Sequence, residues 1–413
     1  MDAERVVIVG ASHAAAQLCG SLRQHGCEGE IELIGDEPSL PYQRPPLSKA
    51  LLSGESTLDD LLIRKPEFYE KQRVAFRRGR VTRIDRASGV VELEDGAVVR
   101  YDRLVLCTGA RARRLELPGA DLTGVHYLRD AADAAAIRSG LDGVGRAVVI
   151  GAGYIGLEAA ASLRKLGIAV SALEMADRVL QRVTAPEVSA FYDRVHREEG
   201  VDLRLGVGVA AIEGDDHVTG VRLTDGDVVP ADRVIVGVGV VPNVELARDA
   251  GLAVDDGIVI DAHGRTDDPC VFAAGDCANY PDGRYGRRLR LEAVSSAVEQ
   301  AKTVAATICG KDAAISALPW FWSDQYDLKL QIAGLSGGYD EVVLRGDPST
   351  GRDFACFYLA DGRLIAADCV NRAQEFMFAK RAITMGLAPD RAALTDPETA
   401  LAELLRAPSV VAG

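Results

Sequence analysis

The sequence predicts an α/β protein with two doubly wound domains and a C-terminal α+β domain. The main observation is an internal repeat: Val6–Gly10 and Ala147–Gly151 are apolar runs of buried-strand length, and each precedes a small-residue helix and another strand. The length of 413 residues suits two or three domains. Beyond Ala317 the pattern changes to alternating strands, which indicates a different final domain. The repeat itself predicts two βαβ units of the dinucleotide-binding kind.

The first unit is expected to continue into a strand at Ile31–Ile34, a proline-rich loop at Leu40–Ser48 and a helix at Pro66–Arg73. A short buried strand with a terminal glycine, Leu104–Gly109, ends this part. Residues 110–119 are rich in arginine and end in Pro-Gly, so we expect them to cross into the second domain.

The second unit repeats this plan with a strand at Ala169–Leu173, a helix at Ala185–Glu199 and a closing strand at Val234–Val238. The strand segment Val271–Asp276 and the helix Ala293–Cys309 come after it, and we expect them to complete the first domain. The second domain is then an insertion in the first. The predicted limits are 1–110 with 240–316 for the first domain, 111–239 for the second and 317–413 for the third.

Composition and charge restrict the possible partners. The chain has 47 Lys and Arg against 61 Asp and Glu, a net charge of -14, which disfavours nucleic acid and anionic lipid as partners. Residues 1–5 lack the basic start of a signal peptide, and the longest nearly apolar stretch, Ala147–Leu157, is too short for a membrane span. The eight cysteines form no C-x-x-C pair or metal-ligand spacing. We therefore expect a cytoplasmic protein with reduced cysteines and no bound metal.

The stronger glycine motif is GAGYIG at 151–156, placed between a strand and a helix. Its glycines permit a tight turn and a close approach to a pyrophosphate, whose charge the helix N-terminus attracts. Glu174 ends the next strand and can accept hydrogen bonds from both ribose hydroxyls. Because its carboxylate would repel a 2'-phosphate, the motif favours NAD(H) over NADP(H).

The first motif, Gly10–Ala15, is weaker because Ser12 replaces the second glycine and Ala15 the third. Asp36 is placed to hold a ribose, with Glu37 as the neighbouring alternative. A third segment ends a buried strand at Asp276, shortly before a helix. An aspartate there suits hydrogen bonding to a polyol such as ribityl, and the helix N-terminus suits a developing flavin anion.

Six segments follow one another in a specific order, and PPLSK at 45–49 and FWSDQY at 321–326 are the most specific parts. The segments are Gly10–Ala15, Pro41–Lys49, Leu104–Gly109, Gly151–Glu158, Phe272–Asp276 and Trp320–Tyr326. In this order the chain resembles, over essentially its whole length, the FAD-dependent ferredoxin reductases of the putidaredoxin reductase type. The resemblance implies that NADH passes hydride to FAD, which passes single electrons to a [2Fe-2S] ferredoxin. That ferredoxin serves a cytochrome P-450 or a ring-hydroxylating oxygenase.

The resemblance also implies a glutathione-reductase-like fold, with FAD in the first domain and NAD in the second. It places Lys49 and Glu158 together beside the flavin as catalytic residues, although from the residues alone both are ordinary surface charges. A lysine there can stabilise reduced, anionic flavin, and the carboxylate would keep it charged and oriented. Trp322 would cover the flavin near the electron exit. The FAD contacts, including those of the first motif, are then Gly10, Ser12, Ala14, Ala15, Asp36, Lys49, Val81, Arg129, Asp276, Val294 and Trp322. The NAD contacts are Gly151, Gly153, Tyr154, Ile155, Gly156, Glu158, Glu174, Arg182 and Gly239.

Ferredoxins of this type are commonly acidic, so docking requires local bases on a chain of net negative charge. We predict a docking surface from basic residues near the flavin exit. The candidates are Arg64, the cluster Arg284, Arg287, Arg288 and Arg290, and Lys302.

Other functions share the nucleotide motifs. A disulfide reductase needs a redox cysteine just after the first βαβ unit, and none lies between Cys27 and Cys107. An NADH-dependent rubredoxin reductase and an NADH oxidase stay open as alternatives. So does a non-enzymatic flavoprotein that senses NADH.

Overall fold

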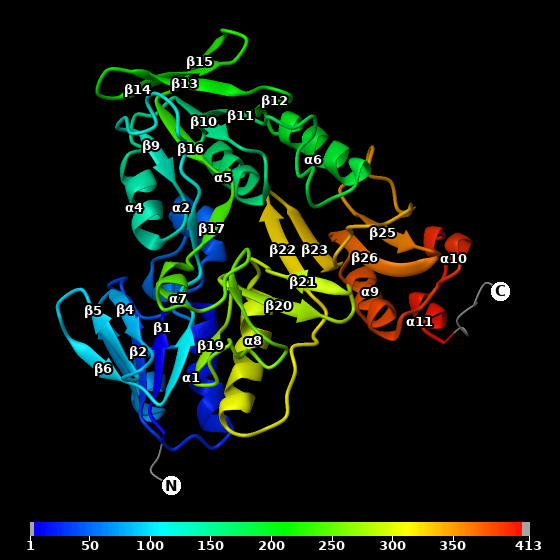
Figure 1. The fold of residues 1–413 in the computed structure, drawn as a ribbon. Coiled ribbons are helices and arrows are strands. Elements are labelled where there is room, and N and C mark those ends of the chain that lie inside the picture. Colours follow the sequence, from blue (N-terminus) through cyan, green and yellow to red (C-terminus); the bar gives the residue numbers. More distant parts are fainter. Residues whose placement is uncertain (1–3, 407–413) are drawn as a thin grey trace. The chain divides into compact units, whose positions relative to one another are not determined.

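The described chain, residues 4–406 of this computed structural model, divides into two units, whose elements Figure 1 labels. Unit 1 comprises residues 4–44, 57–111 and 240–317, and unit 2 comprises residues 45–56, 112–239 and 318–406. Residues 1–3 and 407–413, at the outer ends of the predicted domains, lie outside the described residues. The three predicted domain limits stay a prediction, and the structure groups the described C-terminal residues with 112–239.

Unit 1 is built on a five-stranded parallel sheet in the order β19-β7-β1-β2-β3. Its central strand β1 is wholly apolar and buried on both faces, as the sequence predicted. The late strand β19 pairs with β7, which confirms the expected return of the chain to the first sheet. The strands are β1 (Val6–Val9), β2 (Ile31–Gly35), β3 (Val74–Arg78), β7 (Arg103–Leu106) and β19 (Val271–Ala273).

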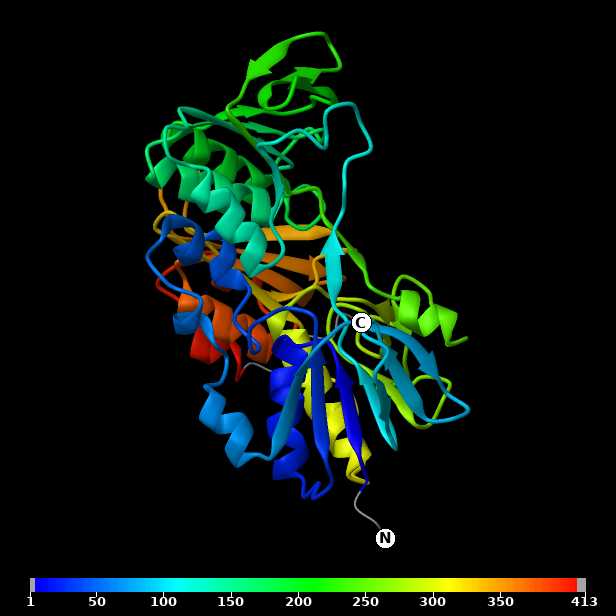
Figure 2. The ribbon, with the colours of Figure 1, turned by 90° about the vertical axis from the view of Figure 1, so that its left-hand side faces the viewer.

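Helices α1 (His13–Gln24) and α8 (Val294–Ile308) pack side by side in unit 1 (Figure 2, blue and yellow). Small residues at their contact, such as Ala15 and Ala301, let the two backbones approach closely within one buried core. Smaller elements complete the unit. They are η2 (Asp59–Leu61), α3 (Pro66–Lys71), β4 (Val81–Asp85), β5 (Val90–Leu93), β6 (Val98–Arg100), β17 (Val240–Pro242) with its partner β8 (Ala110–Ala112), α7 (Glu245–Asp249), β18 (Ile258–Val259), β20 (Ala278–Asp282) and β21 (Arg287–Leu289).

Unit 2 repeats the parallel sheet in the order β12-β11-β10-β16-β9. Its strands are β9 (Val125–Tyr127), β10 (Arg146–Ile150), β11 (Ala169–Leu173), β12 (Asp202–Arg204) and β16 (Arg233–Val236). The helices are α4 (Ala131–Ser139), α5 (Tyr154–Lys165) and α6 (Pro186–Glu198). Two short helices precede them in the chain: η1 (Pro45–Ser48), in the proline-rich loop, and α2 (Ala50–Ser53), just after it. An antiparallel sheet is formed by β13 (Val209–Gly214), β14 (Val218–Leu223) and β15 (Val228–Pro230).

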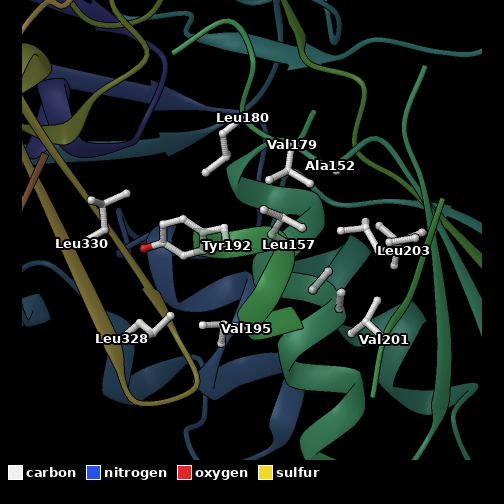
Figure 3. Packing of buried hydrophobic residues seen from close by; sticks show 14 of the residues in the cluster. Ala152, Leu157, Val179, Leu180, Tyr192, Val195, Val201, Leu203, Leu328 and Leu330 are labelled. Atoms are coloured by element: carbon white, nitrogen blue, oxygen red, sulfur yellow. The ribbon is translucent and has the colours of Figure 1, made fainter. Parts of the chain in front are cut away.

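The C-terminal part of unit 2 is an antiparallel sheet in the order β22-β23-β26-β25-β24, followed by helices, as the α+β prediction requires. Its elements are β22 (Trp320–Gln325), β23 (Leu328–Gly334), β24 (Glu341–Arg345), β25 (Phe354–Ala360), β26 (Arg363–Val370), α9 (Ala373–Met385), α10 (Arg391–Thr395) and α11 (Leu401–Leu404). This sheet shares a core with the parallel-sheet part of the same unit. Figure 3 shows Leu328 and Leu330 of β23 on one side of Tyr192 and Leu157 of α5 on the other.

Within residues 4–406, no helix has the length and apolar character that crossing a membrane requires.

Candidate functional site

The stronger glycine motif forms the turn between β10 and α5 in unit 2. Gly151 has φ +100°, and a Cβ there would lie 2.5 Å from the Gly237 carbonyl oxygen. A Cβ on Gly156 would lie 1.9 Å from the Gly151 carbonyl oxygen, so both positions require glycine. A Cβ on Gly153 would meet no atom within 4 Å. This open side at the helix N-terminus fits an approaching pyrophosphate.

Glu174 follows β11 directly, and its carboxylate is held against the glycine turn. Its two oxygens accept hydrogen bonds from the backbone N–H groups of Ala152 (2.7 Å) and Ala176 (2.9 Å). Arg182 and Gly239 also meet within unit 2, since a Cβ on Gly239 would lie 3.9 Å from an Arg182 terminal nitrogen. The structure thus places Glu174, an acid that suits a ribose, beside the glycine turn. It places Arg182 near Gly239, beyond the end of β16.

Two neighbours in the motif have opposite environments. The Tyr154 ring packs against Phe321, with ring centroids 4.8 Å apart, and its hydroxyl is buried with no hydrogen-bond partner. Burial raises the pKa of this hydroxyl well above its usual value. Ile155 is exposed. The Tyr154 side chain therefore packs into the core of unit 2, and only its backbone forms part of the glycine turn.

The weaker glycine motif forms the matching turn of unit 1, between β1 and α1. Gly10 has φ +100°, and a Cβ there would lie 2.1 Å from the Cys107 carbonyl oxygen. Ser12 is the N-cap of α1 but makes no side-chain cap hydrogen bond; its Oγ accepts from Arg44 Nε at 3.1 Å. Ala15, at the third glycine position, is fully buried. The turn keeps its shape although serine replaces the second glycine.

The segment before Asp276 lies beside this turn in unit 1. Gly275 has φ +91°, and a Cβ there would lie 3.4 Å from Ala14 and 3.8 Å from Ala297 on α8, the helix that Val294 begins. Three segments far apart in the sequence therefore meet at one end of the parallel sheet. This is the place where doubly wound sheets bind their ligands.

The two acids after β2 differ in their contacts. Asp36 has a side chain that is 59% exposed and accepts from Arg80 at 3.3 Å. Glu37 pairs instead with the Arg44 guanidinium and the Tyr42 hydroxyl. Arg44 and Tyr42 were not predicted as site residues, although both belong to the proline-rich segment. Because Glu37 is engaged, Asp36 is the acid left more open to a ribose.

Lys49 and Glu158 form an ion pair inside unit 2, with 2.7 Å between Lys49 Nζ and Glu158 Oε1. Lys49 follows η1, and Glu158 lies on the inward face of α5 with a side chain only 3% exposed. Two hydroxyls complete the site: Ser48 Oγ donates to Glu158 Oε2 at 2.5 Å, and Ser323 Oγ donates to Oε1 at 2.6 Å. A buried carboxylate with three donors is well satisfied. Sequence reasoning named the pair but missed both serines.

Comparisons with known proteins agree with this geometry. Residues 4–301 match the family described as pyridine nucleotide-disulphide oxidoreductase, and residues 320–405 match the one described as reductase C-terminal. The chain belongs to the pyridine nucleotide-disulphide oxidoreductase family. Membership implies FAD and NAD(H) or NADP(H) as cofactors.

Its relatives place it among ferredoxin reductases of the putidaredoxin reductase type. A ferredoxin–NAD(P)(+) reductase of Sphingomonas sp is 46% identical over 397 residues, which cover 95% of each chain. Putidaredoxin reductase of Pseudomonas putida is 46% identical over 411 residues, 98% of this chain and 97% of that one. The crystal structure of a covalent putidaredoxin reductase–putidaredoxin complex superposes with a TM-score of 0.95 at 45% identity, covering 98% and 99%.

The remaining predicted cofactor residues of this family member are spread over both units. In unit 1, Val81 begins β4 and is buried. In unit 2, the backbone N–H of Arg129 donates to Asp133. Trp322 stacks on Trp320, with ring centroids 5.5 Å apart. The cofactor roles of Val81, Arg129 and Trp322 stay predictions.

The predicted docking bases, all in unit 1, differ in availability. Arg290 has a side chain only 11% exposed and pairs with Asp256 (3.1 Å) and Glu292 (2.8 Å). Lys302 is half-exposed and pairs with Glu299 one helical turn away. The other bases are Arg64, which lies over the Phe68 ring, Arg287, which is exposed on β21, Arg288, which donates to backbone carbonyls, and Arg284. Arg290 is thus less suited to docking than Arg287 or Lys302.

All eight cysteines of this reductase are free thiols. Burial raises the pKa of the Cys107 and Cys277 thiols, so both favour the unreactive protonated form. Within residues 4–406, no group of three or more His, Cys, Asp or Glu side chains is arranged to hold a metal.

Proposed function

We propose that the chain is an FAD-dependent NADH:ferredoxin oxidoreductase whose acceptor is a [2Fe-2S] ferredoxin. The observation that carries the proposal is the ion pair between Lys49 and the buried Glu158, in a chain with two nucleotide turns and no cysteine between Cys27 and Cys107. Without a cysteine in that segment, electrons leave the flavin by another route than a disulfide. Single-electron transfer to a protein partner fits this requirement.

The names of the relatives support the same class of partner. One relative is the ferredoxin–NAD(+) reductase component of an anthranilate 1,2-dioxygenase system in Burkholderia cepacia, 42% identical over 407 residues. Another is putidaredoxin reductase. By analogy, the ferredoxin of this chain would serve a cytochrome P-450 or a ring-hydroxylating oxygenase, with no nucleic acid or membrane as partner.

The residues present fit the implied cofactors. The first turn, with Gly10, Ser12 and Ala15, and the adjacent Asp276 would hold FAD. The second turn and Glu174 would hold NADH. Bound FAD accepts hydride from NADH and gives up its electrons one at a time.

Within this scheme Lys49 and Glu158 have distinct tasks. The Lys49 ammonium would supply positive charge where negative charge develops on reduction of the bound flavin. Glu158 orients Lys49 through a 2.7 Å contact and is itself held by the hydroxyls of Ser48 and Ser323. No side chain needs to abstract a proton, because hydride transfer depends on positioning.

A cytoplasmic location is part of the proposal. It is supported by eight free thiols, which suit a reducing compartment.

Thiol independence tests the electron route. We expect purified protein to carry FAD and to be bleached by anaerobic NADH at the same rate before and after alkylation with iodoacetamide, because no thiol takes part. The measurement is flavin absorbance in a stopped-flow instrument. If alkylation in the presence of NADH abolished turnover, a disulfide-reductase mechanism would replace the proposed one.

Charge reversal tests the docking surface. We expect Lys302→Glu to raise the KM for ferredoxin about 5-fold, because an acidic partner loses an attractive contact of roughly 1 kcal/mol. Reduction of ferricyanide by NADH should not change. As a matched control, Lys311→Glu reverses another unit 1 lysine that donates to His25. Equal KM values in both variants would place docking elsewhere.

A further inference from the structure

A chain of hydrogen bonds runs from the Glu158 carboxylate to Tyr326, entirely within unit 2. Ser323 Oγ donates to Glu158 Oε1 over 2.6 Å, and Gln325 Nε2 donates to Ser323 Oγ over 3.1 Å. Gln325 Oε1 lies 2.8 Å from His196 Nε2, and the Tyr326 hydroxyl lies 3.1 Å from His196 Nδ1. Ser323, Gln325 and His196 are 0%, 2% and 0% exposed, so bulk water does not compete for these bonds.

Donor and acceptor chemistry gives this chain one direction. A carboxylate only accepts, so Ser323 uses its single hydrogen on Glu158 and must accept from the Gln325 amide. The Gln325 oxygen must then accept from His196, which therefore carries its proton on Nε2. His196 Nδ1 is left as the acceptor for the Tyr326 hydroxyl. Every hydrogen-bond dipole in the chain points its positive end toward Glu158.

The protonation state of His196 agrees with this direction. Burial lowers the pKa of His196 to about 4, so the imidazole is neutral at neutral pH. A neutral imidazole has one donor and one acceptor nitrogen, as the chain requires.

The backbone at the far end of the chain is unusual. Tyr326 lies in the turn between β22 and β23 with φ +56°, in a left-handed region that aromatic residues rarely adopt. In this conformation its ring meets His196 edge to face, with ring centroids 5.1 Å apart. The strained turn thus places the Tyr326 hydroxyl on His196 Nδ1.

We propose that Ser323, Gln325 and His196 are positioning residues for the Lys49–Glu158 pair. Glu158 Oε1 accepts from both Ser323 and Lys49, so the chain that fixes this oxygen also fixes where the Lys49 ammonium lies. This inference rests on the proposed function, in which Lys49 stabilises the reduced flavin. It extends the site to the C-terminal sheet and to α6.

Two substitutions break the chain without adding charge: Ser323→Ala removes the first link, and Gln325→Met removes the second with little change in volume. We expect each to lower the limiting rate of flavin reduction by NADH about 3- to 10-fold, since Lys49 is less well placed. The KM for NADH should change much less. The midpoint potential of bound FAD should become more negative, because the reduced flavin loses stabilisation.

A double variant separates a connected chain from local packing defects. Because both substitutions interrupt the same chain, Ser323→Ala with Gln325→Met should be no slower than Ser323→Ala alone. Tyr192→Phe is the matched control: it removes a buried hydroxyl from α6 that has no hydrogen-bond partner. Its rate and potential should equal those of the wild type.

A measurement on the FAD-bound protein, with neither NADH nor ferredoxin present, tests the direction of the chain. With ¹⁵N-labelled histidine, the resonance that His196→Gln removes should report the Nε2–H tautomer from about pH 8 down to about pH 5.5, below the ordinary pKa of histidine. An Nδ1–H tautomer, or a charged ring in this range, would overturn the proposal.

Other results would also overturn it. One is a wild-type flavin potential and reduction rate in both Ser323→Ala and Gln325→Met. Another is a double variant in which the two losses of rate add. A third is a loss of rate in Tyr192→Phe equal to that in the two single variants. If the wild-type enzyme failed to reduce any [2Fe-2S] ferredoxin, the proposed function would fail instead. The two failures are distinguishable because the flavin potential and the histidine tautomer need no ferredoxin.

Discussion

Replacing Lys49 with methionine is expected to slow the reduction of bound FAD by NADH on the order of 100-fold, as removal of one donor to a developing anion does elsewhere. The Lys49 side chain is 20% exposed, and its ion-pair partner Glu158 is only 3% exposed, so the buried carboxylate holds this charge in place. The measurement is the limiting rate of flavin bleaching in anaerobic stopped-flow experiments.

Two controls separate the role of this charge from stability. Lys49→Met leaves the Glu158 carboxylate without its counterion, which can destabilise the fold. The double variant Lys49→Met with Glu158→Gln removes both charges, and it should still be slow. Lys165→Met removes a lysine of the same unit that pairs with Glu55 in an exposed pair, and it should reduce at the wild-type rate. A wild-type rate in the double variant would show that Lys49 does not act on the flavin.

Glu174→Ala is expected to lower kcat/KM for NADH about 5- to 150-fold, the equivalent of roughly 1 to 3 kcal/mol for a lost bidentate contact to the ribose. The loss should appear mainly in KM. The kcat/KM for NADPH should fall much less, because the same substitution removes the repulsion between Glu174 and the 2'-phosphate. Steady-state kinetics with both nucleotides measure the change in preference.

The control for this substitution removes a different carboxylate from the same sheet. Glu174 accepts backbone hydrogen bonds from Ala152 and Ala176, so its loss also frees two N–H groups. Asp202→Ala removes an exposed carboxylate from the neighbouring strand β12 and should leave both nucleotides unaffected. An unchanged ratio of NADH to NADPH activity in Glu174→Ala would mean that Glu174 does not select the nucleotide.

Local sequence patterns predicted much of the fold. The apolar runs at Val6–Gly10 and Ala147–Gly151 became the central strands β1 and β10 of two parallel sheets, because such runs suit strands covered on both faces. The strand pairs formed by β18, β20 and β21 were not predicted. Their apolar runs are short, and pairing such as Ile258 with Ala278 joins segments that no local signal connects.

The site was predictable only in part for a related reason. Lys49 and Glu158 were recognised through the resemblance, but Ser48 and Ser323 reach Glu158 across 110 and 165 residues of sequence. The local sequence around a serine does not show which residue its hydroxyl will contact at such separations. Arg290 illustrates the converse: its basic cluster predicted a docking surface, and local patterns did not indicate that the fold pairs Arg290 with Asp256 and Glu292.

The most direct test of the account is the electron balance between NADH and a [2Fe-2S] ferredoxin without oxygen. A hydride carries two electrons and the cluster accepts one, so each NADH consumed should reduce two ferredoxin molecules. The visible absorbance of the cluster measures this reduction. Alkylation of the enzyme should not change this ratio. NADH consumption that required oxygen, with no ferredoxin reduced, would contradict the account and identify an NADH oxidase.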